Sequence, residues 1–527
     1  MKTLFELLEG LPRQQVAQAD GDLGVEINAP VVESDADVEP GGVFVARPGL
    51  KVDGHDFIPR AIANGAAAII GEREIGGLSI PYVRVRNAQA ATGYLAAAYH
   101  DYPSRKLIVV GVTGTDGKTT TSTLIHAMLR RAAQGRAGLI STVHADLGGA
   151  TADTGLHVTT PTAPQVQALL ARMVENGAHY AVIEMTSHGL AQGRLNGIDV
   201  DVAVLTNLTH EHLDFHGSFE NYRAAKGILF GMLGTSAHKT GLSRYPLEKT
   251  AIINADDANA DYFTLYEADR KILYGLSEAA HYRAVNIQYA PKGIFFNVEY
   301  PDDQVFGTTV SGERYHSPLL GEFNVYNALA AVETGIALSI QTADIVDGLR
   351  DVAVIPGRME RIDAGQPYIA MVDFAHTPNA LRNALTACRG MLKTGKRLIA
   401  VFGSAGLRDV EKRTLMAEIG AELADVSILT AEDPRTESLE DILATMASAC
   451  VSKGGVEGKT FYRVPDRGHA LLLACQLASA GDIVIACGKG HEQSLCFGTV
   501  EYEWDDRDAL RSAIGGVALG GLPTSGM

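Results

Sequence analysis

The pattern of hydrophobic and polar positions from residue 107 onward predicts strands and helices that alternate along the chain. Short apolar runs rich in β-branched residues are typical of buried strands, and apolar residues three and four positions apart are typical of amphipathic helices. Such alternation indicates βαβ units around a mostly parallel sheet. The predicted strands are Leu107–Val112, Tyr180–Glu184, Asp201–Thr206, Ala251–Asn254 and Lys271–Gly275, and the predicted helices include Ala163–Asn176 and Asn324–Leu338.

Two regions interrupt or repeat this series. Between residues 282 and 310, alternating apolar and polar positions flank Pro291-Lys292-Gly293 and predict an antiparallel hairpin. Near Pro356 a second alternating series begins, with strands at Tyr368–Phe374, Arg397–Phe402, Val426–Thr430 and Asp482–Cys487. The first 105 residues read as short strands and helices of a small α/β unit, which Asp101–Ser104 joins to the rest as a hinge.

The segment Leu107–Arg131 carries the first candidate for chemistry. Its apolar strand ends in glycines at positions 111, 114 and 117, and Lys118, Thr119 and Thr120 then begin a helical pattern. This order suits a triphosphate, because backbone N–H groups face the phosphates, the lysine reaches them and a threonine hydroxyl can ligate Mg²⁺. Val112 stands where the strict phosphate-loop (P-loop) pattern has its first glycine. A tight strand–helix turn without a ligand is the alternative.

The predicted fold is therefore α/β with three domains. These are a small N-terminal α/β domain (1–105), a central P-loop ATPase domain with a mostly parallel sheet (106–355) and a C-terminal Rossmann-like α/β domain (356–515). The last segment, 516–527, is rich in glycine and small residues and is predicted to be disordered.

Composition and charge narrow the class of protein. A net charge of −17 argues against a nucleic-acid partner or an anionic membrane surface, because both need basic faces. Acidic residues inside the first apolar stretch argue against a signal peptide, and no uncharged apolar run reaches the roughly 18 residues of a membrane span. Five cysteines without a C-x-x-C pair predict reduced thiols in a cytoplasmic protein.

Polar residues gather after two of the predicted strands, and ligands of α/β sheets bind at such strand ends. The two clusters are Glu184, Ser187 and His188 after one strand, and Asn207, His210, His212, Asp214 and His216 after the other. Beside a phosphate loop they favour an Mg²⁺ site over a purely structural role. Glu184 suits a hard cation as an oxygen ligand. On chemical grounds alone, His212 would be an unusual ligand.

Eleven motifs, which lie in order within the matching stretch from Pro40 to Asp508, resemble those of the Mur ligases, and most of all the tripeptide synthetase (MurE) type. They are V-T-G-T-D-G-K-T-T-T, H-V-T-T-P, E-M-T-S-H-G-L, N-L-T-H-E-H-L-D-F-H-G, Y-R-A-A-K, G-E-F-N-V-Y-N-A-L-A-A, G-R-M-E, V-D-F-A-H-T-P-N-A-L, G-L-R-D-V-E-K-R, E-D-P-R-T-E and G-K-G-H-E. The resemblance implies a domain for the UDP-sugar, a central ATPase and a domain for the incoming amino acid. It also implies the reaction: ATP and Mg²⁺ activate the D-Glu γ-carboxylate of UDP-MurNAc-L-Ala-D-Glu as an acyl phosphate, and a diamino acid attacks it. Such an enzyme is expected to act as a monomer.

The resemblance also implies roles for particular residues. Lys118 and Thr119 would bind phosphate and Mg²⁺, Glu184 and His212 would help to hold the metals, and Lys226 matches a carbamylated lysine whose carboxylate binds a second Mg²⁺. Without the resemblance, Lys226 would read as a surface lysine of a helix. The nucleotide positions are Gly114, Thr115, Asp116, Gly117, Thr120, Asn324, Asn327, Arg358, Asp373 and His376; the UDP-MurNAc-dipeptide positions are Ser34, Thr159, Thr160, Ser187, Gln192 and Arg194; and the amino-acid positions are Arg408, Asp433, Arg435, Gly488 and Glu492.

Three departures from the family pattern stand out. Asp116 replaces an asparagine of the phosphate loop, and Asp35 follows Ser34 where the family has an arginine. In the stretch E-D-P-R, Asp433 replaces the asparagine of D-N-P-R, whereas Arg435 keeps the bidentate partner for a distal carboxylate. We favour meso-diaminopimelate as the added amino acid over ornithine or lysine. More remote alternatives are a folylpolyglutamate synthase, which lacks a domain before the phosphate loop, and a non-catalytic Mur-like subunit.

Overall fold

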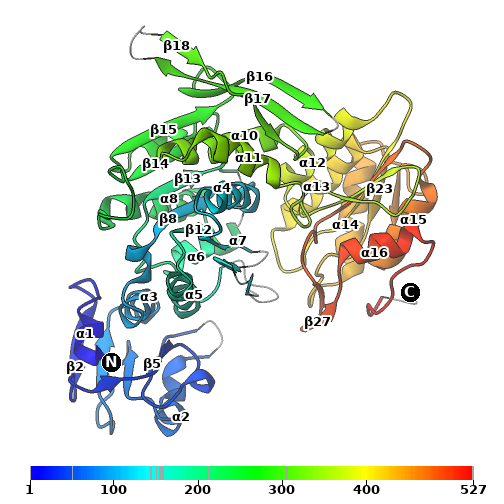
Figure 1. Cartoon of the computed structure of the whole chain (residues 1–527). Coiled ribbons are helices and arrows are strands. Elements are labelled where there is room, and N and C mark those ends of the chain that lie inside the picture. The colour runs from blue at the N-terminus through cyan, green and yellow to red at the C-terminus, as the bar shows by residue number, and fades with distance from the viewer. Residues whose placement is uncertain are drawn as a thin grey trace.

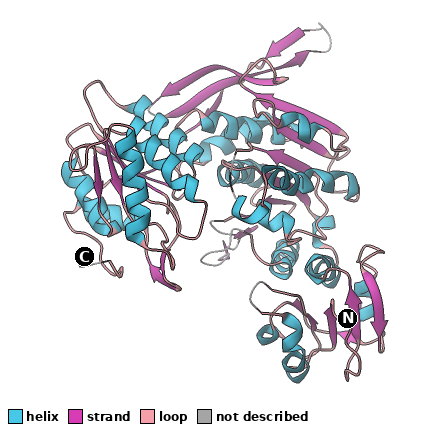
Figure 2. Cartoon of the chain, turned by 180° about the vertical axis from the view of Figure 1, so that it is seen from behind, coloured by secondary structure: helices cyan, strands magenta, loops and turns pink. Residues whose placement is uncertain are grey.

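The computed structural model describes residues 2–49, 52–142, 145–149, 151–152, 160–209, 211, 213–290, 292–302 and 307–524. The chain forms three bodies, each built on its own sheet, with the N-terminal and C-terminal bodies on either side of the central one (Figure 1). Viewed from behind, helices cover the central and C-terminal sheets, whereas the outermost strands of the central sheet extend away from them (Figure 2). The predicted three-domain α/β fold is confirmed.

The N-terminal body has a five-stranded sheet in the order β2-β7-β6-β5-β4. Its helix α3 begins at Asn87, whose side chain accepts from the Ala90 N–H, and its small residues let it pack closely on the sheet. The elements are β1 (Lys2–Thr3), α1 (Leu4–Leu8), β2 (Val16–Asp20), β3 (Glu26–Ile27), β4 (Val31–Val32), β5 (Val43–Val45), α2 (Ile58–Ala63), β6 (Ala68–Gly71), β7 (Tyr82–Val85) and α3 (Ala88–Tyr99). A short 3₁₀ turn, Pro103–Lys106, leads into the central sheet.

The central body has a 12-stranded sheet in the order β11-β10-β9-β12-β8-β13-β14-β15-β16-β17-β18, with β19 paired to β17. Strands β9, β12, β8, β13, β14, β15 and β16 run parallel to one another in this order. From β9 to β14 in this order, both faces are buried, which explains the continuous apolar sequences of these strands. The strands are β8 (Ile108–Thr113), β9 (Ala137–Ile140), β10 (Ala145–Leu147), β11 (Thr151–Ala152), β12 (Tyr180–Glu184), β13 (Val202–Leu205), β14 (Thr250–Asn254), β15 (Arg270–Gly275), β16 (Tyr282–Ala290), β17 (Gly293–Asp302), β18 (Gly307–Val310) and β19 (Tyr315–Ser317).

Helices cover both faces of the central sheet. One apolar layer includes residues of α4 (Lys118–Ala132), α10 (Phe323–Ala337) and α11 (Thr342–Asp351), and the other includes residues of α5 (Ala163–Glu175) and α8 (Phe219–Thr235). Shorter helices are α6 (Ser187–Ala191), α7 (Leu213–His216) and α9 (Ala260–Thr264). Strand β8 lies inside the sheet between β12 and β13, so the turn that follows it faces the strand ends on both sides.

The C-terminal body has a six-stranded sheet in the order β20-β21-β25-β22-β23-β24 and a separate hairpin, β26–β27. Its elements are β20 (Glu360–Ile362), β21 (Ile369–Asp373), α12 (Pro378–Met391), β22 (Leu398–Phe402), α13 (Val410–Leu423), β23 (Val426–Leu429), α14 (Leu439–Ser452), β24 (Phe461–Arg463), α15 (Arg467–Leu477), β25 (Ile483–Cys487), β26 (Ser494–Phe497), β27 (Val500–Glu503) and α16 (Asp506–Ile514). All five cysteines lie in this body as free, buried thiols.

The end of the chain differs from the disordered tail that composition predicts. Leu522 is buried in the core of the C-terminal body, and the Thr524 hydroxyl donates to Asp466 at 2.9 Å. Residues up to 524 therefore pack on the domain. Among the described residues, no helix is long and apolar enough to cross a membrane.

Helix α10 carries a carboxyl group inside the apolar core. The Glu333 side chain is fully buried, and neither of its oxygens has a hydrogen-bond partner. Burial raises the pKa of Glu333 to about 8, because removal from water disfavours the charged form, and Arg270 only partly opposes this shift.

We expect Glu333→Met to stabilise the protein increasingly with pH. Because the folded-state pKa of Glu333 lies above its unfolded value of 4.5, the cost of the carboxyl group is absent below pH 4.5 and grows as the pH rises towards 8. The free energy of unfolding should therefore rise by about 1 kcal/mol at pH 5 and on the order of 4 kcal/mol at pH 8. Urea unfolding of both proteins at the two pH values measures this difference. An equal gain at both would contradict it.

Candidate active site

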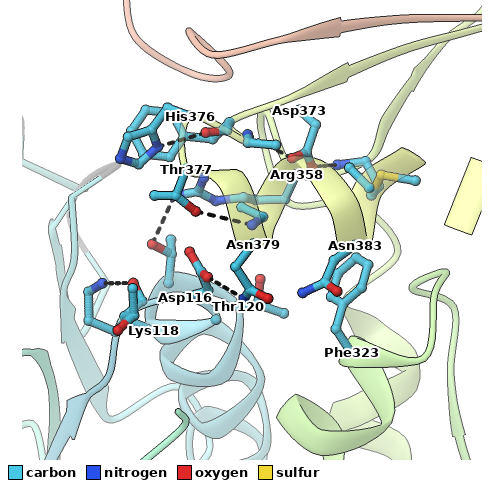
Figure 3. A pocket seen from close by; sticks show the side chains of 18 of the residues that line it. Asp116, Lys118, Thr120, Phe323, Arg358, Asp373, His376, Thr377, Asn379 and Asn383 are labelled. Carbon is cyan, nitrogen blue, oxygen red and sulfur yellow. Dashed lines mark hydrogen bonds between the residues drawn. The ribbon is translucent and has the colours of Figure 1, made fainter. Parts of the chain in front are cut away.

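A cavity of about 1410 Å³ lies between the central and C-terminal bodies, at the carboxyl ends of the central strands. Figure 3 shows Asp116 and Lys118 of the glycine turn opposite Asp373, His376 and Thr377 of the C-terminal body. The cavity brings together most of the residues that the sequence predicts. They are Gly114, Thr115, Asp116, Gly117, Lys118, Thr119, Thr120, Glu184, Ser187, Arg194, Lys226, Asn324, Asn327, Arg358, Asp373, His376, Arg408, Asp433, Arg435, Gly488 and Glu492.

The turn between β8 and α4 has the shape of a phosphate-binding loop. Gly114 and Gly117 adopt φ values of +151° and +82°, and a Cβ atom there would lie 1.9 Å from Thr206 Oγ1 and 2.4 Å from Asn327 Oδ1. Only glycine fits either position. Lys118 begins α4 and its Nζ donates to the Thr115 carbonyl at 2.8 Å, which holds the ammonium over the turn. The N-terminus of α4 and this ammonium make the turn a site for anions.

Thr119 and Glu184 form an oxygen-rich pair beside the turn. The Thr119 hydroxyl donates to Glu184 Oε2 at 3.0 Å, and Arg358 donates to the same hydroxyl at 3.2 Å. Both Thr119 and Glu184 are buried. Hydroxyl and carboxylate oxygens are ligands that Mg²⁺ accepts. His212, a further predicted ligand, lies outside the described residues. Within the described ranges, no group of three or more histidine, cysteine or acidic side chains is arranged to hold a metal.

Lys226 lies inside the site, not on the surface. It projects from α8, is 1% exposed, and its Nζ donates to the Gly114 carbonyl at 2.5 Å. Burial, with a further contribution from the nearby Lys118, lowers its pKa well below the usual lysine range. A lowered pKa favours the neutral form of the amine, and a neutral amine is a nucleophile.

The C-terminal body contributes a second wall. Asp373, at the end of β21, accepts from the N–H groups of Met359 and Ala375 at 2.7 and 2.8 Å. The Arg358 guanidinium lies over the Phe374 ring at 4.3 Å. Burial lowers the pKa of His376 well below its usual value, so that its ring is neutral and its Nδ1 bonds the Phe374 carbonyl at 2.9 Å.

Two contacts that sequence reasoning missed join the domains across the cavity. The Asn379 amide of α12 donates to Asp116 Oδ2 at 2.9 Å, and Lys412 of α13 pairs with Glu211 at 3.4 Å. The carboxylate that replaces the family's asparagine is thus engaged by the C-terminal body. Residues this far apart in sequence give no local signal of their contact.

The predicted sugar-nucleotide contacts are only partly brought together. Arg194 donates to the Thr160 carbonyl at 2.6 Å, and Ser187 and Arg194 line the cavity. Ser34, Thr160 and Gln192 are not part of its described lining, and Thr159 lies outside the described residues. Next to Ser34, Arg47 pairs with Glu33 at 2.9 Å, which places an arginine near the position where the family's is missing.

Beside the residues predicted to bind the amino acid lies a buried lysine, Lys489, that sequence reasoning also missed. Lys489 Nζ lies 3.0 and 3.1 Å from the two Asp433 oxygens and 2.6 Å from Glu492 Oε2. Arg435 is not paired with Asp433, and its Nη1 donates to the Gly406 carbonyl at 3.2 Å. A carbonyl leaves the positive charge of the Arg435 guanidinium uncompensated, so this end of the pocket suits an anionic group.

The stretch E-D-P-R is held in an unusual backbone conformation. Asp433 and Arg435 adopt φ values of +39° and +53°, which non-glycine residues rarely do. Hairpin β26–β27 supports both: Cys496 N–H donates to Asp433 Oδ1 at 2.9 Å, Arg435 N–H donates to the Cys496 carbonyl at 3.1 Å, and Gly498 N–H donates to the Arg435 carbonyl at 2.7 Å.

Glu432 is a further cavity residue that the sequence prediction left out. Its side chain is 6% exposed, its Oε2 has no hydrogen-bond partner, and a Cβ on Gly488 would lie 2.7 Å from that oxygen. Burial raises the pKa of Glu432 to about 7. An orphaned buried carboxyl oxygen in a cavity wall is suited to a donor supplied by a ligand.

Comparisons with known proteins agree with this geometry. The chain matches family models described as "Mur ligase family, catalytic domain" over residues 36–100, "Mur ligase middle domain" over 112–335 and "Mur ligase, glutamate ligase domain" over 357–490. It is 40% identical to a UDP-N-acetylmuramyl-tripeptide synthetase of Roseiflexus sp. (strain RS-1), over 94% of this chain and 96% of that protein. It is 37% identical to a UDP-N-acetylmuramoyl-L-alanyl-D-glutamate–2,6-diaminopimelate ligase of Bacillus licheniformis, over 92% and 94% of the two chains.

Solved structures extend the comparison. A UDP-N-acetylmuramoyl-L-alanyl-D-glutamate–2,6-diaminopimelate ligase matches with a TM-score of 0.65 and 31% identity, covering 98% of this chain and 99% of that one. A folylpolyglutamate synthase of Mycobacterium tuberculosis reaches a TM-score of 0.59 at 16% identity over 80% of this chain and 94% of that one, which shows a shared fold only. Family models, full-length relatives and a cavity that assembles the predicted motifs lead to one conclusion: the chain belongs to the Mur ligase family, as an ATP-dependent ligase of the UDP-MurNAc-tripeptide synthetase type.

Proposed function

We propose that the protein adds meso-diaminopimelate to the γ-carboxylate of D-Glu in UDP-MurNAc-L-Ala-D-Glu, with ATP and Mg²⁺, during peptidoglycan synthesis. The single observation that carries the amino-acid assignment is the Arg435 guanidinium, whose side-chain partner is a neutral carbonyl. Burying a cation beside a substrate without a carboxylate is costly, whereas the distal carboxylate of diaminopimelate offers a bidentate partner. An ammonium of the same substrate would satisfy the orphaned Glu432 oxygen.

The chain's own residues suit the first half-reaction. The D-Glu carboxylate attacks the terminal phosphorus of ATP, which forms an acyl phosphate and releases ADP. Both reactants are anionic, so the site must neutralise charge and hold them in line. Lys118 and the N-terminus of α4 offer positive charge at the turn, and Arg358 adds a partly buried cation from the C-terminal body.

The second half-reaction needs the incoming amine at the acyl carbon. The amine forms the amide bond, and the carbon–oxygen bond to phosphate breaks. The amino-acid pocket lies in the same cavity as Lys118, so one site holds both steps. The five free, buried cysteines fit the reducing cytoplasm, where we expect the enzyme to act as a monomer.

The residues present fit Mg²⁺. Thr119 and Glu184 supply neighbouring buried oxygens, and a carbamate on the Lys226 amine, whose pKa burial lowers, would add a carboxylate. When bound, the metal ions would neutralise phosphate charge during the transfer. His212 stays a predicted ligand.

We expect wild-type kcat/KM for meso-diaminopimelate to exceed that for lysine or ornithine by at least ~100-fold, as when a buried charged group loses its partner. Arg435→Ala should erase most of that gap. ADP release with UDP-MurNAc-L-Ala-D-Glu and each amino acid measures both values. Preference of the wild type for lysine or ornithine would refute the amino-acid assignment and leave the ligase chemistry intact. No ADP release with any amino acid would instead favour a non-catalytic Mur-like protein.

A further inference from the structure

We infer that Lys489 determines amino-acid specificity by binding Asp433, which leaves Arg435 available for the carboxylate of the substrate. The inference rests on the proposed function and goes beyond it. It attributes the preference for a dicarboxylic diamino acid to a residue that does not itself contact the distal carboxylate. Lys489 is in this sense a positioning residue.

The contacts around Lys489 explain why Asp433 is occupied. The ammonium is 1% exposed and lies between two carboxylates, those of Asp433 and Glu492. Both Asp433 oxygens face it, at 3.0 and 3.1 Å, and one of them also accepts from the Cys496 N–H. A carboxylate whose two oxygens both face one ammonium is already neutralised, so it gains little from a second cation.

Arg435 is the obvious competitor for Asp433. The two residues flank Pro434, and a bidentate arginine–aspartate pair is a strong ion pair. An asparagine at this position, as in D-N-P-R, cannot neutralise the arginine. An aspartate can, unless another cation holds it. Lys489 therefore lets this chain carry Asp433 and still present a charged Arg435 to the cavity.

The inference predicts a change of specificity that a second substitution reverses. In Lys489→Met, Asp433 should turn to Arg435, and the ratio of kcat/KM for meso-diaminopimelate to that for lysine should fall at least about tenfold, as expected when a buried ion pair exchanges partners. In Lys489→Met/Asp433→Asn the ratio should return to within about threefold of that of Asp433→Asn alone, because the amide cannot neutralise Arg435.

Lys249→Met is the matched control. Lys249 is similarly buried and pairs with Asp201 at 3.0 Å, at the amino ends of β13 and β14, whereas the cavity lies at the carboxyl ends of the central strands. Its loss should lower the melting temperature without changing the ratio. A wild-type ratio in Lys489→Met, or a double variant with a ratio as low as the single one, would overturn the inference.

If Lys489→Met does not fold, the variant Asp433→Asn tests the inference with Lys489 in place. Asp433→Asn alone should keep the ratio within about threefold of wild type, because Lys489 already neutralises the aspartate. A fall of tenfold or more would overturn the inference. If the wild type prefers lysine, both the proposed amino acid and the inference about Lys489 are wrong. If the wild type prefers diaminopimelate and Lys489→Met keeps that preference, only the inference about Lys489 is wrong.

Discussion

Lys118→Ala should reduce the turnover of the ligase by roughly 10³-fold or more, because its ammonium is the cation held at the phosphate turn. The alanine leaves the glycine turn and α4 in place, so folding should be little affected. Phosphoryl transfer depends mostly on positioning and charge neutralisation, and both are lost here. The measurement is ADP release with saturating UDP-MurNAc-L-Ala-D-Glu and meso-diaminopimelate.

A matched lysine in the same domain separates this effect from a general change of charge. Lys271 is exposed on β15 and donates to the Thr264 carbonyl at 2.7 Å. Lys271→Ala should retain wild-type turnover. Near-normal activity of Lys118→Ala would mean that the turn does not hold the reacting phosphates.

The second large effect is expected at Lys226. Carbon dioxide reacts with a neutral amine, and burial favours that form of Lys226 by lowering its pKa. If the resulting carbamate carries the negative charge that a metal needs, Lys226→Ala should be nearly inactive. Formate or acetate should restore part of the rate by occupying the space of the lost carboxylate.

Lys249→Ala provides the comparison for that rescue. Lys249 is also buried, but its Nζ pairs with Asp201 at 3.0 Å, far from the cavity, so its loss should not be reversed by small carboxylates. Full activity of Lys226→Ala without added carboxylate would contradict the carbamate. A ¹³C signal from labelled carbon dioxide on the wild type, absent in the variant, would support it independently.

The sequence predicts those parts of the site that depend on local pattern. The strand, glycine turn and helix around Lys118 follow from residues adjacent in the chain, and the long buried strands follow from their apolar runs. Short elements were missed, among them β20, β24 and hairpin β26–β27, because three or four residues carry too little periodicity. The burial of Leu522 was also missed, because its neighbours are mostly small residues that give no apolar pattern.

The sequence also did not predict contacts between residues that are distant along the chain. The pairing of Asp433 with Lys489 joins the loops that follow β23 and β25, and that of Asp116 with Asn379 joins different domains. In the sequence, Arg435 is the cation nearest to Asp433, whereas the partner in the structure is Lys489, 56 residues away. Charge alone cannot identify a partner when the fold decides which side chains meet.

The support that hairpin β26–β27 gives to E-D-P-R bears on how this pocket can be redesigned or exchanged between relatives. Backbone conformations like those of Asp433 and Arg435 cost on the order of 1–3 kcal/mol each when nothing holds them. If the four residues are moved into another ligase without the hairpin, no hydrogen bonds hold this backbone conformation. The segment should then adopt a different, unstrained conformation. E-D-P-R should therefore be exchanged together with the segment from Gly488 through Glu503, which contains the hairpin. Recombination between relatives should preserve selectivity only when both segments come from one parent.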